Sequence, residues 1–595
     1  MLVPNNELGD EGRNDLHKDD LSVKPFTVSF FWANHWSIKH MIDRVIASTS
    51  VKETRFDKEN CYTILKESLV NGFCHLGHPE TFNALMTPNS NVVVCWLIKT
   101  FTKSRSIDLL PPSPPALPIV GHLYLLSSKL PESLQTLAHR YGPLMRIRIG
   151  ASTFFVVSNA TIAKEIFKTH DINFSSRYES GPSAYNIYRG TGFITGPYGA
   201  YYRFMRKLCA TELFAGPQMD RYNKLREQEI ERLLKSLMKS SREGKPCDLG
   251  LELAAMANNL TFRMIVNRRF CENNGSEAKR MRDSIVEIME LATKFGINEL
   301  FGFLNKIDLF GNGKNLKDAM WRYDELIEEI MKGYEENEMN DRENEDKDMM
   351  DILLETYRDP DDEVKLTRNQ IKHFLLELFM ASVDSTSAAV QWAIAELINH
   401  PDVFKKLRDE IKSIVGSSRL VKESDVPKLP YLQAVVKESL RLHPPGPIIH
   451  RQCTNDCKIN GYDITAKTKT LINIHAIMRD PEIWKEPNEF IPERFVVNFS
   501  QMNDRDDQME MRGQDFSYIP FGGGRRGCSG VSLAYTVMHA TIGAFVQCFD
   551  WKVKGGEKVD ISVGLGFAGA MAVPLICYPI TRFDPFLAYL PDQAF

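Results

Sequence analysis

The sequence predicts a mainly α fold with small β-sheets. Long helix-favouring segments carry this prediction, because 221–310 is mostly helical by pattern and 370–400 and 531–549 each read as one long helix. Extended patterns are short by comparison, since 144–149 and 153–157 together make only one hairpin, joined through a glycine. Helices are therefore expected to supply most of the core.

The composition is that of an ordinary globular protein. The chain has 595 residues, of which 43% are hydrophobic and 25% are charged, and its net charge of −4 gives no indication of a nucleic-acid partner. Eleven cysteines lie without the regular spacing of a disulfide framework, which is typical of reduced thiols in a cytosol-facing protein. Cys453 and Cys457 form a C-x-x-x-C pair, which we interpret as two incidental loop cysteines.

A glycine-rich segment with a single cysteine, 521–530, carries the strongest chemical signal. It reads Phe-Gly-Gly-Gly-Arg-Arg-Gly-Cys-Ser-Gly, and an apolar helix is predicted directly after it. We expect the three glycines to allow positive φ, and the helix N-terminus to direct N–H groups toward the Cys528 sulfur. With Arg525 and Arg526 nearby, the pKa of the thiol should be lowered, and the thiolate is the metal-binding form.

Two other interpretations of this segment, a phosphate-binding loop and a structural zinc site, are weaker, and a third, a buried cysteine without a ligand, stays open. A phosphate-binding loop would end in Lys-Ser/Thr, which is missing here. A structural zinc site needs about four ligands, and no second Cys/His pair at zinc spacing lies nearby. A buried cysteine without a ligand is the usual case for a single thiol. An iron porphyrin needs only one protein ligand, and a lone thiolate fits that requirement.

The pattern Phe521-x-x-Gly524-x-Arg526-x-Cys528-x-Gly530 resembles the haem-binding signature of the cytochrome P450 family of haem-thiolate monooxygenases. The loop is similar in style to plant microsomal A-type members that act on flavonoids and triterpenoids. The resemblance implies an α-helical prism around a buried haem b. It also implies that Cys528 ligates the iron and that the other four motif residues contact the cofactor.

The resemblance divides the chain into three parts. Residues 1–91 are an atypical leader, and 92–118 contain a membrane anchor shortened to its last two turns, a basic stop and a proline-rich hinge. Residues 119–595 form the catalytic domain. We expect this domain to lie at the cytosolic face of the endoplasmic reticulum membrane, attached to the membrane surface.

Three further arginine or aromatic positions match family contacts to the haem propionates. The family has Trp-x-x-x-Arg where this chain has Tyr202 and Arg206, and Arg451 ends the segment 444–451, which is predicted to turn into a strand. A guanidinium suits a carboxylate bidentately, and the Tyr202 hydroxyl can still donate a hydrogen bond. Without the resemblance, the Tyr202–Arg206 helix would be an ordinary basic face exposed to solvent.

A short polar stretch inside the predicted helix 370–400 matches the family's oxygen-activation motif. Asp384 stands for the acid, Ser385 replaces the usual threonine, and Thr386 is adjacent, while Ser382 replaces a glycine. The resemblance implies that the acid and the alcohol deliver protons. An acidic side chain in an apolar helix costs free energy unless it is hydrated or paired. The alternative interpretation is that Asp384 and Ser385 cap a helix end, but their position in the middle of the predicted helix argues against it.

The resemblance also implies a structural charge triad and a set of substrate contacts. Glu438 and Arg441 lie at i, i+3 on one helix face, and Arg494 follows in a Pro-Glu-Arg-Phe segment. We interpret these three as a buried cluster that sets the cysteine loop. The candidates for substrate contact, with core packing as the alternative for each phenylalanine, are Tyr185, Ile187, Phe193, Phe301, Ile448, Ile449 and Phe567.

The implied reaction is monooxygenation of a small apolar substrate with O2 and electrons from NADPH. The chain has no flavin or nucleotide motif, so a separate NADPH-cytochrome reductase is expected as partner. We favour a triterpenoid substrate, with a flavonoid or isoflavonoid hydroxylase as the alternative. Another class, an O2-independent haem-thiolate isomerase or dehydratase, generally lacks the acid–alcohol pair. A non-catalytic haem protein also stays open.

Overall fold

The computed structural model describes most of the chain from residue 109 onward. The described residues are 109–117, 120–150, 152–178, 185–266, 276–293, 311–338, 347–359, 361, 364–496, 516–553, 555–556, 558–564 and 569–586. The predicted leader, most of the anchor segment, Phe301 and Phe567 lie outside them.

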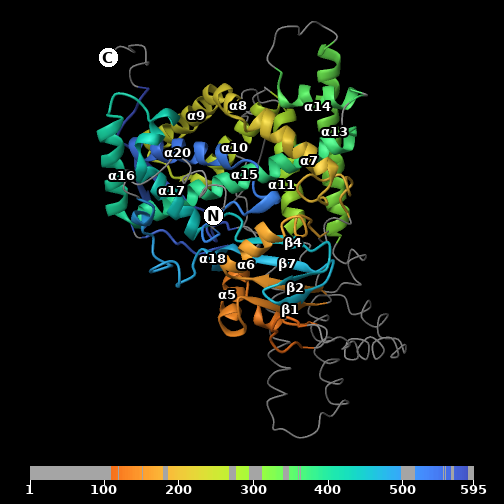
Figure 1. The fold of residues 1–595 in the computed structure, drawn as a ribbon. Helices are drawn as coiled ribbons and strands as arrows, with labels where there is room; N and C mark the ends of the chain where they lie inside the picture. Colours follow the sequence, from red (N-terminus) through yellow and green to blue (C-terminus); the bar gives the residue numbers. More distant parts are fainter. Residues whose placement is uncertain are drawn as a thin grey trace, which may run out of the picture. The chain divides into compact units, whose positions relative to one another are not determined.

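Helices dominate the fold, which confirms the predicted class (Figure 1). The helices are α5 (Leu130–Tyr141), α6 (Ala160–Lys164), α7 (Ala200–Leu208), α8 (Gly216–Arg221), α9 (Asn223–Arg242), α10 (Leu249–Val266), α11 (Ser276–Thr293), α13 (Asn312–Glu338), α14 (Met349–Arg358), α15 (Arg368–Asn399), α16 (Pro401–Ile414), α17 (Pro430–Leu442), α18 (Ile474–Ile477) and α20 (Val531–Cys548). The long helices predicted at 370–400 and 531–549 correspond to α15 and α20. The 221–310 segment contains α9, α10 and α11.

Helix α15 lies at the centre of the helical part. It begins with a capping box, in which the Gln370 N–H donates to Thr367 Oγ1 (3.2 Å) and the Thr367 N–H donates to Gln370 Oε1 (2.9 Å). It ends at Asn399, because Pro401 begins the next helix. Helices α10, α17 and α20 pack against it, and its largest buried side chain is Trp392. A helix that is covered on most sides reads as apolar on most sides, which explains its broad apolar pattern.

A four-stranded sheet lies to one side of the helices (Figure 1). Strands β1 (Leu144–Ile149) and β2 (Ser152–Val157) form the predicted antiparallel hairpin. Strand β7 (Lys469–Asn473) then pairs with β2 in parallel, and β4 (Ile448–Gln452) pairs with β7 in antiparallel. The sheet therefore joins segments that lie far apart in the sequence.

The remaining strands form two smaller sheets. These are β3 (Cys247–Asp248), β9 (Ile576–Thr581) and β8 (Phe549–Val553) in one sheet, and β5 (Cys457–Ile459) and β6 (Tyr462–Ile464) in the other. Strand β8 begins directly where α20 ends. Small sheets of this kind fasten loops to the helical body, and here they tie the end of the chain to β3.

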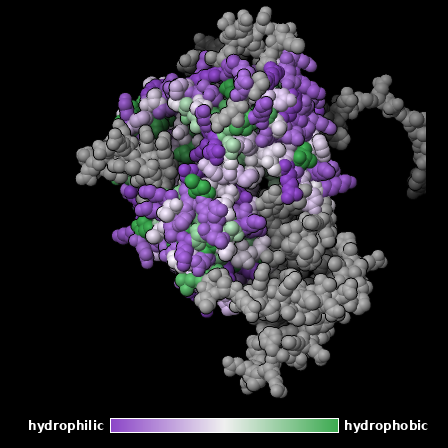
Figure 2. Space-filling model, turned by 45° about the vertical axis from the view of Figure 1, so that its right-hand side comes forward, coloured by the Kyte–Doolittle hydropathy of each residue, from purple (hydrophilic) through white to green (hydrophobic). Residues whose placement is uncertain are grey.

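The apolar side chains are largely inside. One face of the molecule is mainly hydrophilic, with hydrophobic side chains in small separate groups (Figure 2). Within the described residues, α20 is the single helix that is long and apolar enough to cross a membrane. Most of it is buried against other helices, so its apolar character is explained by core packing.

Candidate functional site

Cys528 lies between a 3₁₀ turn, η8 (Gly524–Arg526), and the start of α20. The turn needs glycine, because Gly522 and Gly524 have φ of 72° and 68°. A Cβ at Gly524 would also lie 2.3 Å from Asp171 Oδ1. The backbone thus folds as the sequence predicts, and it leaves the Cys528 side chain exposed beside a well-packed loop.

The pKa of the Cys528 thiol is shifted in the direction opposite to our prediction. Although part of Cys528 is exposed, protein atoms surround its sulfur closely, and this burial raises the pKa by more than a hydrogen bond from the Gly530 N–H and the charge of Arg206 lower it. The prediction of a lowered pKa is therefore wrong for the chain by itself, since burial cannot be read from the local sequence. A bound metal cation would favour the thiolate directly.

Arg525 and Arg526 hold the loop in place, and neither is among the groups that lower the pKa of the Cys528 thiol. Arg525 forms an ion pair with Asp171 at 2.7 Å. Arg526 is buried and donates to the carbonyls of Ser175 (2.7 Å), Phe193 (2.9 Å) and Gly196 (2.5 Å). Both side chains therefore join the cysteine loop to the 171–196 region.

Helix α7 supports the same loop from another side. The Tyr202 hydroxyl donates to the Arg525 carbonyl at 2.7 Å, and the Arg526 guanidinium lies 3.8 Å from the centre of the Tyr202 ring. Arg206 Nη1 donates to the Gly527 carbonyl (2.5 Å) and to Ser529 Oγ (3.1 Å). The predicted role of these two side chains at a propionate stays a prediction.

A cluster of three arginines lies next to the loop, two of them buried and the third, Arg177, half-buried, and sequence reasoning missed Arg177. Burial among protein atoms lowers the pKa of Arg177, Arg451 and Arg526, and the charge of Arg177 lowers the pKa of the other two further. Arg451 donates only to the carbonyls of His450 (3.1 Å) and Arg526 (3.4 Å), and Arg177 Nε has no hydrogen-bond partner. Among the described residues, no carboxylate forms an ion pair with any of the three.

The middle of α15 has an open face. Ala381, Asp384 and Ser385 are exposed and Ala388 is half-buried, although the flanking turns of the helix are buried. These positions follow the i, i+3, i+4, i+7 spacing of a single helix face. Asp384 is flanked by enough protein for burial to raise the pKa of its carboxyl. The part of α15 that carries the predicted acid–alcohol pair is therefore not covered by other parts of the described chain.

The other polar groups on this stretch point into the structure or back to the helix. Ser385 Oγ donates to the Ala381 carbonyl at 2.7 Å, and Thr386 is half-buried. Thr261 Oγ1 donates to Ser382 Oγ at 2.9 Å, which fixes Ser382 against α10. The serine that replaces the family's glycine thus lies at a helix–helix contact.

The substrate candidates occupy three different environments. Phe193 is buried, and its ring stacks on Tyr202 with centroids 5.2 Å apart, so it takes part in core packing. Tyr185 and Ile187 are half-buried beside the same core. Ile448 is buried in the sheet, whereas Ile449 is half-buried and reaches the loop, since a Cβ at Gly522 would lie 2.8 Å from Ile449 Cδ1.

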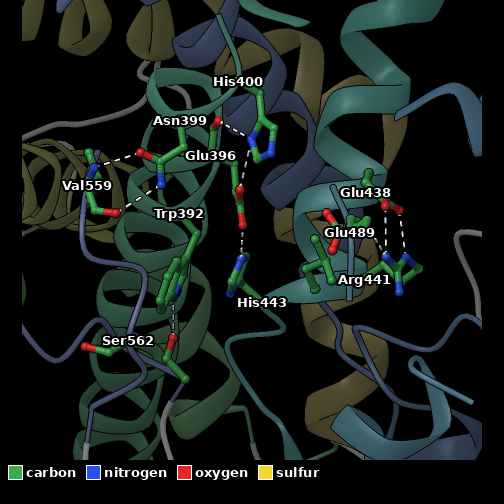
Figure 3. A network of polar contacts seen from close by, with 12 residues as sticks. Trp392, Glu396, Asn399, His400, Glu438, Arg441, His443, Glu489, Val559 and Ser562 are labelled. Atoms are coloured by element: carbon green, nitrogen blue, oxygen red, sulfur yellow. Dashed lines mark hydrogen bonds and ion pairs between the residues drawn. The ribbon is translucent and has the colours of Figure 1, made fainter. Parts of the chain in front are cut away.

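A buried carboxylate brings Glu438, Arg441 and Arg494 together. Arg441 donates to both Glu438 oxygens, at 2.7 and 2.8 Å (Figure 3). Arg494 Nε lies 3.3 Å from Glu438 Oε1. Further Arg441 donors reach the carbonyls of Met478 and Pro487. Every charge in this cluster is matched by a partner, as expected for a structural element.

Two buried groups on α15 were not predicted. Glu377 accepts from the N–H groups of Phe193 (2.6 Å), Ile194 (2.8 Å) and Thr195 (3.0 Å), which fixes the loop that covers Arg526. Glu396 accepts from His443 Nε2 at 2.6 Å (Figure 3). Their acidic character on an apolar helix was the only available sequence signal.

Trp392, one turn from Glu396 on α15, contacts both His443 and Gly569. Its ring stacks on His443, with centroids 4.0 Å apart, and its Nε1 donates to the Gly569 carbonyl at 2.6 Å. This contact fixes Gly569, where the described chain resumes.

The residues present fit haem b. One exposed thiol with a backbone N–H donor can serve as a single iron ligand, and no group of three or more His, Cys, Asp or Glu that could hold a metal ion is found in the described part of the chain. The buried arginine cluster has the charge to pair with two carboxylates. Cys528, Arg177 and Arg451 are thus suited to hold the iron and the propionates.

Comparison with known proteins gives consistent results. A family model for cytochrome P450 matches residues 111–572. Two proteins of Glycine max are each 40% identical to this chain: 3,9-dihydroxypterocarpan 6A-monooxygenase, with 81% of this chain and 95% of that protein covered, and beta-amyrin 24-hydroxylase, with 83% and 96% covered. Cytochrome P450 705A12 of Arabidopsis thaliana is 41% identical, with 82% and 94% covered.

A solved structure agrees with the fold. A zebra fish cytochrome P450 with progesterone superposes with a TM-score of 0.65 at 22% identity, covering 76% of this chain and 99% of that chain. This likeness confirms the architecture predicted from the cysteine motif. Together with the family model and the plant relatives, it establishes that the chain belongs to the cytochrome P450 family of oxygen-incorporating monooxygenases.

Proposed function

We propose that this protein hydroxylates a C–H bond of a bulky apolar plant secondary metabolite, with a triterpenoid as the first candidate. The observation that carries this proposal is the open face of α15, where Asp384 and Ser385 are exposed in the middle of a buried helix. When bound, the thiolate-ligated haem supplies the activation of O2. The chain itself must hold the cofactor, position the substrate and supply protons.

Asp384 is suited to hold and pass a proton. Burial raises the pKa of its carboxyl, so the protonated form is more available near neutral pH than for an ordinary aspartate. The neighbouring Ser385 hydroxyl donates to the Ala381 carbonyl, and its oxygen can accept a proton from another donor. This acid–alcohol pair supports oxygen chemistry over the O2-independent isomerase or dehydratase class.

The uncharged character of the substrate candidates favours an apolar skeleton. Ile187, Ile448 and Ile449 are apolar, and no charged side chain stands among the candidates in the described residues. The name of one relative, beta-amyrin 24-hydroxylase, agrees with a triterpenoid. The name of another, 3,9-dihydroxypterocarpan 6A-monooxygenase, agrees with the alternative of a flavonoid-type substrate, at the same 40% identity.

The electron donor we propose is a separate NADPH-cytochrome reductase, and the location is the cytosolic face of the endoplasmic reticulum membrane. The proline-rich segment after residue 110 and the exposed Leu109 and Leu110 before it agree with attachment to a membrane surface. Fractionation of the full chain expressed in plant cells tests the location, because it should recover the protein with microsomes.

The decisive experiment is reconstitution of the full chain with haem, reductase and NADPH. Beta-amyrin and 3,9-dihydroxypterocarpan, tested separately, each report one substrate class through a product heavier by one oxygen atom. Turnover of the triterpene alone supports our first candidate, and turnover of the pterocarpan alone supports the alternative. Conversion that proceeds without NADPH and reductase would contradict monooxygenation.

A further inference from the structure

Two thiols at the ends of the short loop between β4 and β5 lie close together: Cys453 directly follows β4, and Cys457 is the first residue of β5. Cys453 Sγ and Cys457 Sγ are 3.7 Å apart. In a disulfide the sulfur atoms are about 2 Å apart and the Cα atoms about 4.4–6.8 Å apart. The loop between the two cysteines is short, and Thr454, Asn455 and Asp456 on it are exposed. The sulfurs therefore need to approach by less than about 2 Å to reach bonding distance.

A second pair of cysteines provides an internal comparison. Cys247 Sγ and Cys577 Sγ are 3.9 Å apart across the β3–β9 pair, and both side chains are buried. In the first pair, Cys453 is buried but Cys457 is half-buried. A dissolved oxidant can thus reach the first pair through Cys457, whereas protein atoms cover both members of the second pair.

The surroundings of Cys457 favour its thiolate over that of Cys453. Burial raises the pKa of both thiols, and that of Cys453 reaches about 12. Hydrogen bonds from Cys453 and Asn173 oppose this effect at Cys457. Cys457 is therefore the more readily ionised sulfur, and its reaction with an oxidant should become faster as the pH rises.

We propose that Cys453 and Cys457 form a reversible disulfide, with hydrogen peroxide as oxidant and a small thiol such as glutathione as reductant. The Cys457 thiolate attacks one peroxide oxygen, the O–O bond breaks, and one water leaves after protonation. The Cys453 sulfur then attacks the Cys457 sulfur, the S–O bond breaks, and a second water leaves. The two thiols lose two electrons and two protons, which convert one peroxide into two waters.

The loop that carries this pair is fastened to the segment that supports Cys528. Asn173 Oδ1 accepts from the Asn455 N–H (2.7 Å) and from Thr454 Oγ1 (2.8 Å), and its Nδ2 donates to the Asn455 carbonyl (2.9 Å). Two residues earlier, Asp171 holds Arg525 of the cysteine loop. Closing the disulfide draws Cys453 and Cys457 together, and the Asn173 contacts transmit this shift toward Cys528.

The test treats the full haem-loaded protein with hydrogen peroxide, blocks free thiols with iodoacetamide, and maps the peptides by mass spectrometry without reduction. We expect the 453 and 457 sites to resist alkylation and to be joined, lighter by two hydrogen atoms, and glutathione to restore both thiols. Cys247 and Cys577 should be alkylated separately once the protein is unfolded. Separate alkylation of Cys453 and Cys457 after peroxide treatment would overturn the proposal.

Two variants and a second readout sharpen the test. Cys457→Ser should leave Cys453 free after peroxide, whereas Cys577→Ser, a matched change in the buried pair, should leave the yield of the 453–457 link unchanged. Haem loss, followed by absorbance, should be several-fold faster for oxidised than for reduced wild-type protein, and unaffected by peroxide in Cys457→Ser. Equal rates in oxidised and reduced wild type would disprove the coupling to the cysteine loop. Neither readout depends on the substrate.

Discussion

Arg441 and Arg451 are both almost completely buried, with 0% and 2% of their surfaces exposed, but their surroundings differ. Arg441 forks the Glu438 carboxylate, and its remaining donors reach backbone carbonyls (Figure 3). Arg451 donates to two backbone carbonyls only, and the buried Arg526 and the half-buried Arg177 lie close to it.

The difference indicates in which of the two clusters the buried positive charge is neutralised by groups of the protein itself. A buried charge is tolerated when it is paired and hydrogen-bonded, and it is costly otherwise. The Glu438 cluster meets this condition with protein groups alone, so we assign it to stability. In the described residues no carboxylate forms an ion pair with the Arg451 cluster, although Glu377 and Asp171 act on it from a greater distance. We therefore propose that this cluster binds the haem propionates. The predictions below test this distinction.

The largest effect is expected from Glu438→Gln. The change leaves Arg441 buried without a counter-charge, which should lower the free energy of unfolding by about 3–5 kcal/mol. Chemical denaturation of the haem-free protein measures this loss. As the matched control, Glu493→Gln removes an exposed partner of Lys406 nearby and should cost less than about 1 kcal/mol. Equal losses in the two variants would refute the structural assignment.

Asp384→Asn tests a group that belongs to neither cluster. The change removes the proton donor from the open face of α15 but keeps its size, so product formation should slow by about 100-fold. Haem content and the free energy of unfolding should be those of wild type. Turnover with the reconstituted reductase is the measurement, and Ser382→Ala, at the contact with α10, is the control. Undiminished turnover would remove Asp384 from proton delivery.

Arg451→Leu should act on binding and not on the fold. It removes an unpaired buried charge, so the haem-free protein should be as stable as wild type or more stable. Haem binding should weaken about tenfold, which corresponds to about 1.4 kcal/mol. Titration with haem and denaturation of the haem-free form separate the two effects. Arg451→Lys keeps the charge and should retain part of the affinity; a Leu variant with a destabilised fold and unchanged haem affinity would contradict the assignment.

The smallest effect concerns pH. Burial and the charges of Arg177 and Arg451 lower the pKa of His450 to about 4, whereas an unfolded histidine titrates near pH 6.5. Between these values the unfolded chain binds the additional proton, so stability falls as the pH drops from about 6.5 to about 4. In Arg451→Leu one repulsive charge is gone, and this fall should be shallower.

Unfolding free energies at several pH values check this prediction on the haem-free protein. Burial and the charge of Lys437 also lower the pKa of His539 to about 4. His539 should therefore cause a similar loss of stability at acid pH in both proteins, and it serves as the internal reference. The same slope in wild type and Arg451→Leu would mean that Arg451 does not act on His450.

Local patterns in the sequence were sufficient for the fold and for the cysteine loop. Helix α15, the β1–β2 hairpin and the glycine turn before Cys528 depend on nearby residues, and they lie where the sequence predicts them. The pKa direction of Cys528 was wrong because it depends on burial by distant segments. Arg177 was missed because a single arginine in a loop shows no periodicity, and only the folded chain brings it close to Arg451.

Glu377 was missed for a related reason. Its carboxylate accepts three backbone N–H groups from the 193–195 loop, and a backbone donor leaves no trace in the sequence. The Glu438 cluster could be predicted from the sequence, because Arg441 follows Glu438 at i, i+3 and because the family motif adds Arg494. Contacts between side chains of one motif are thus easier to predict than contacts between a side chain and a distant backbone.

The parallel pairing of β2 with β7 has a consequence for the order of folding. It joins Phe154–Val157 to Lys469–Ile472, so the sheet cannot close during synthesis until the ribosome has passed the second strand. Contacts between such distant segments form slowly, because a long stretch of chain must be ordered first. Strand β4, which carries Arg451, is held through β7 and therefore acquires its final position late. Haem loading is accordingly expected to follow the release of the nearly complete chain and to compete with chaperone binding of the open sheet.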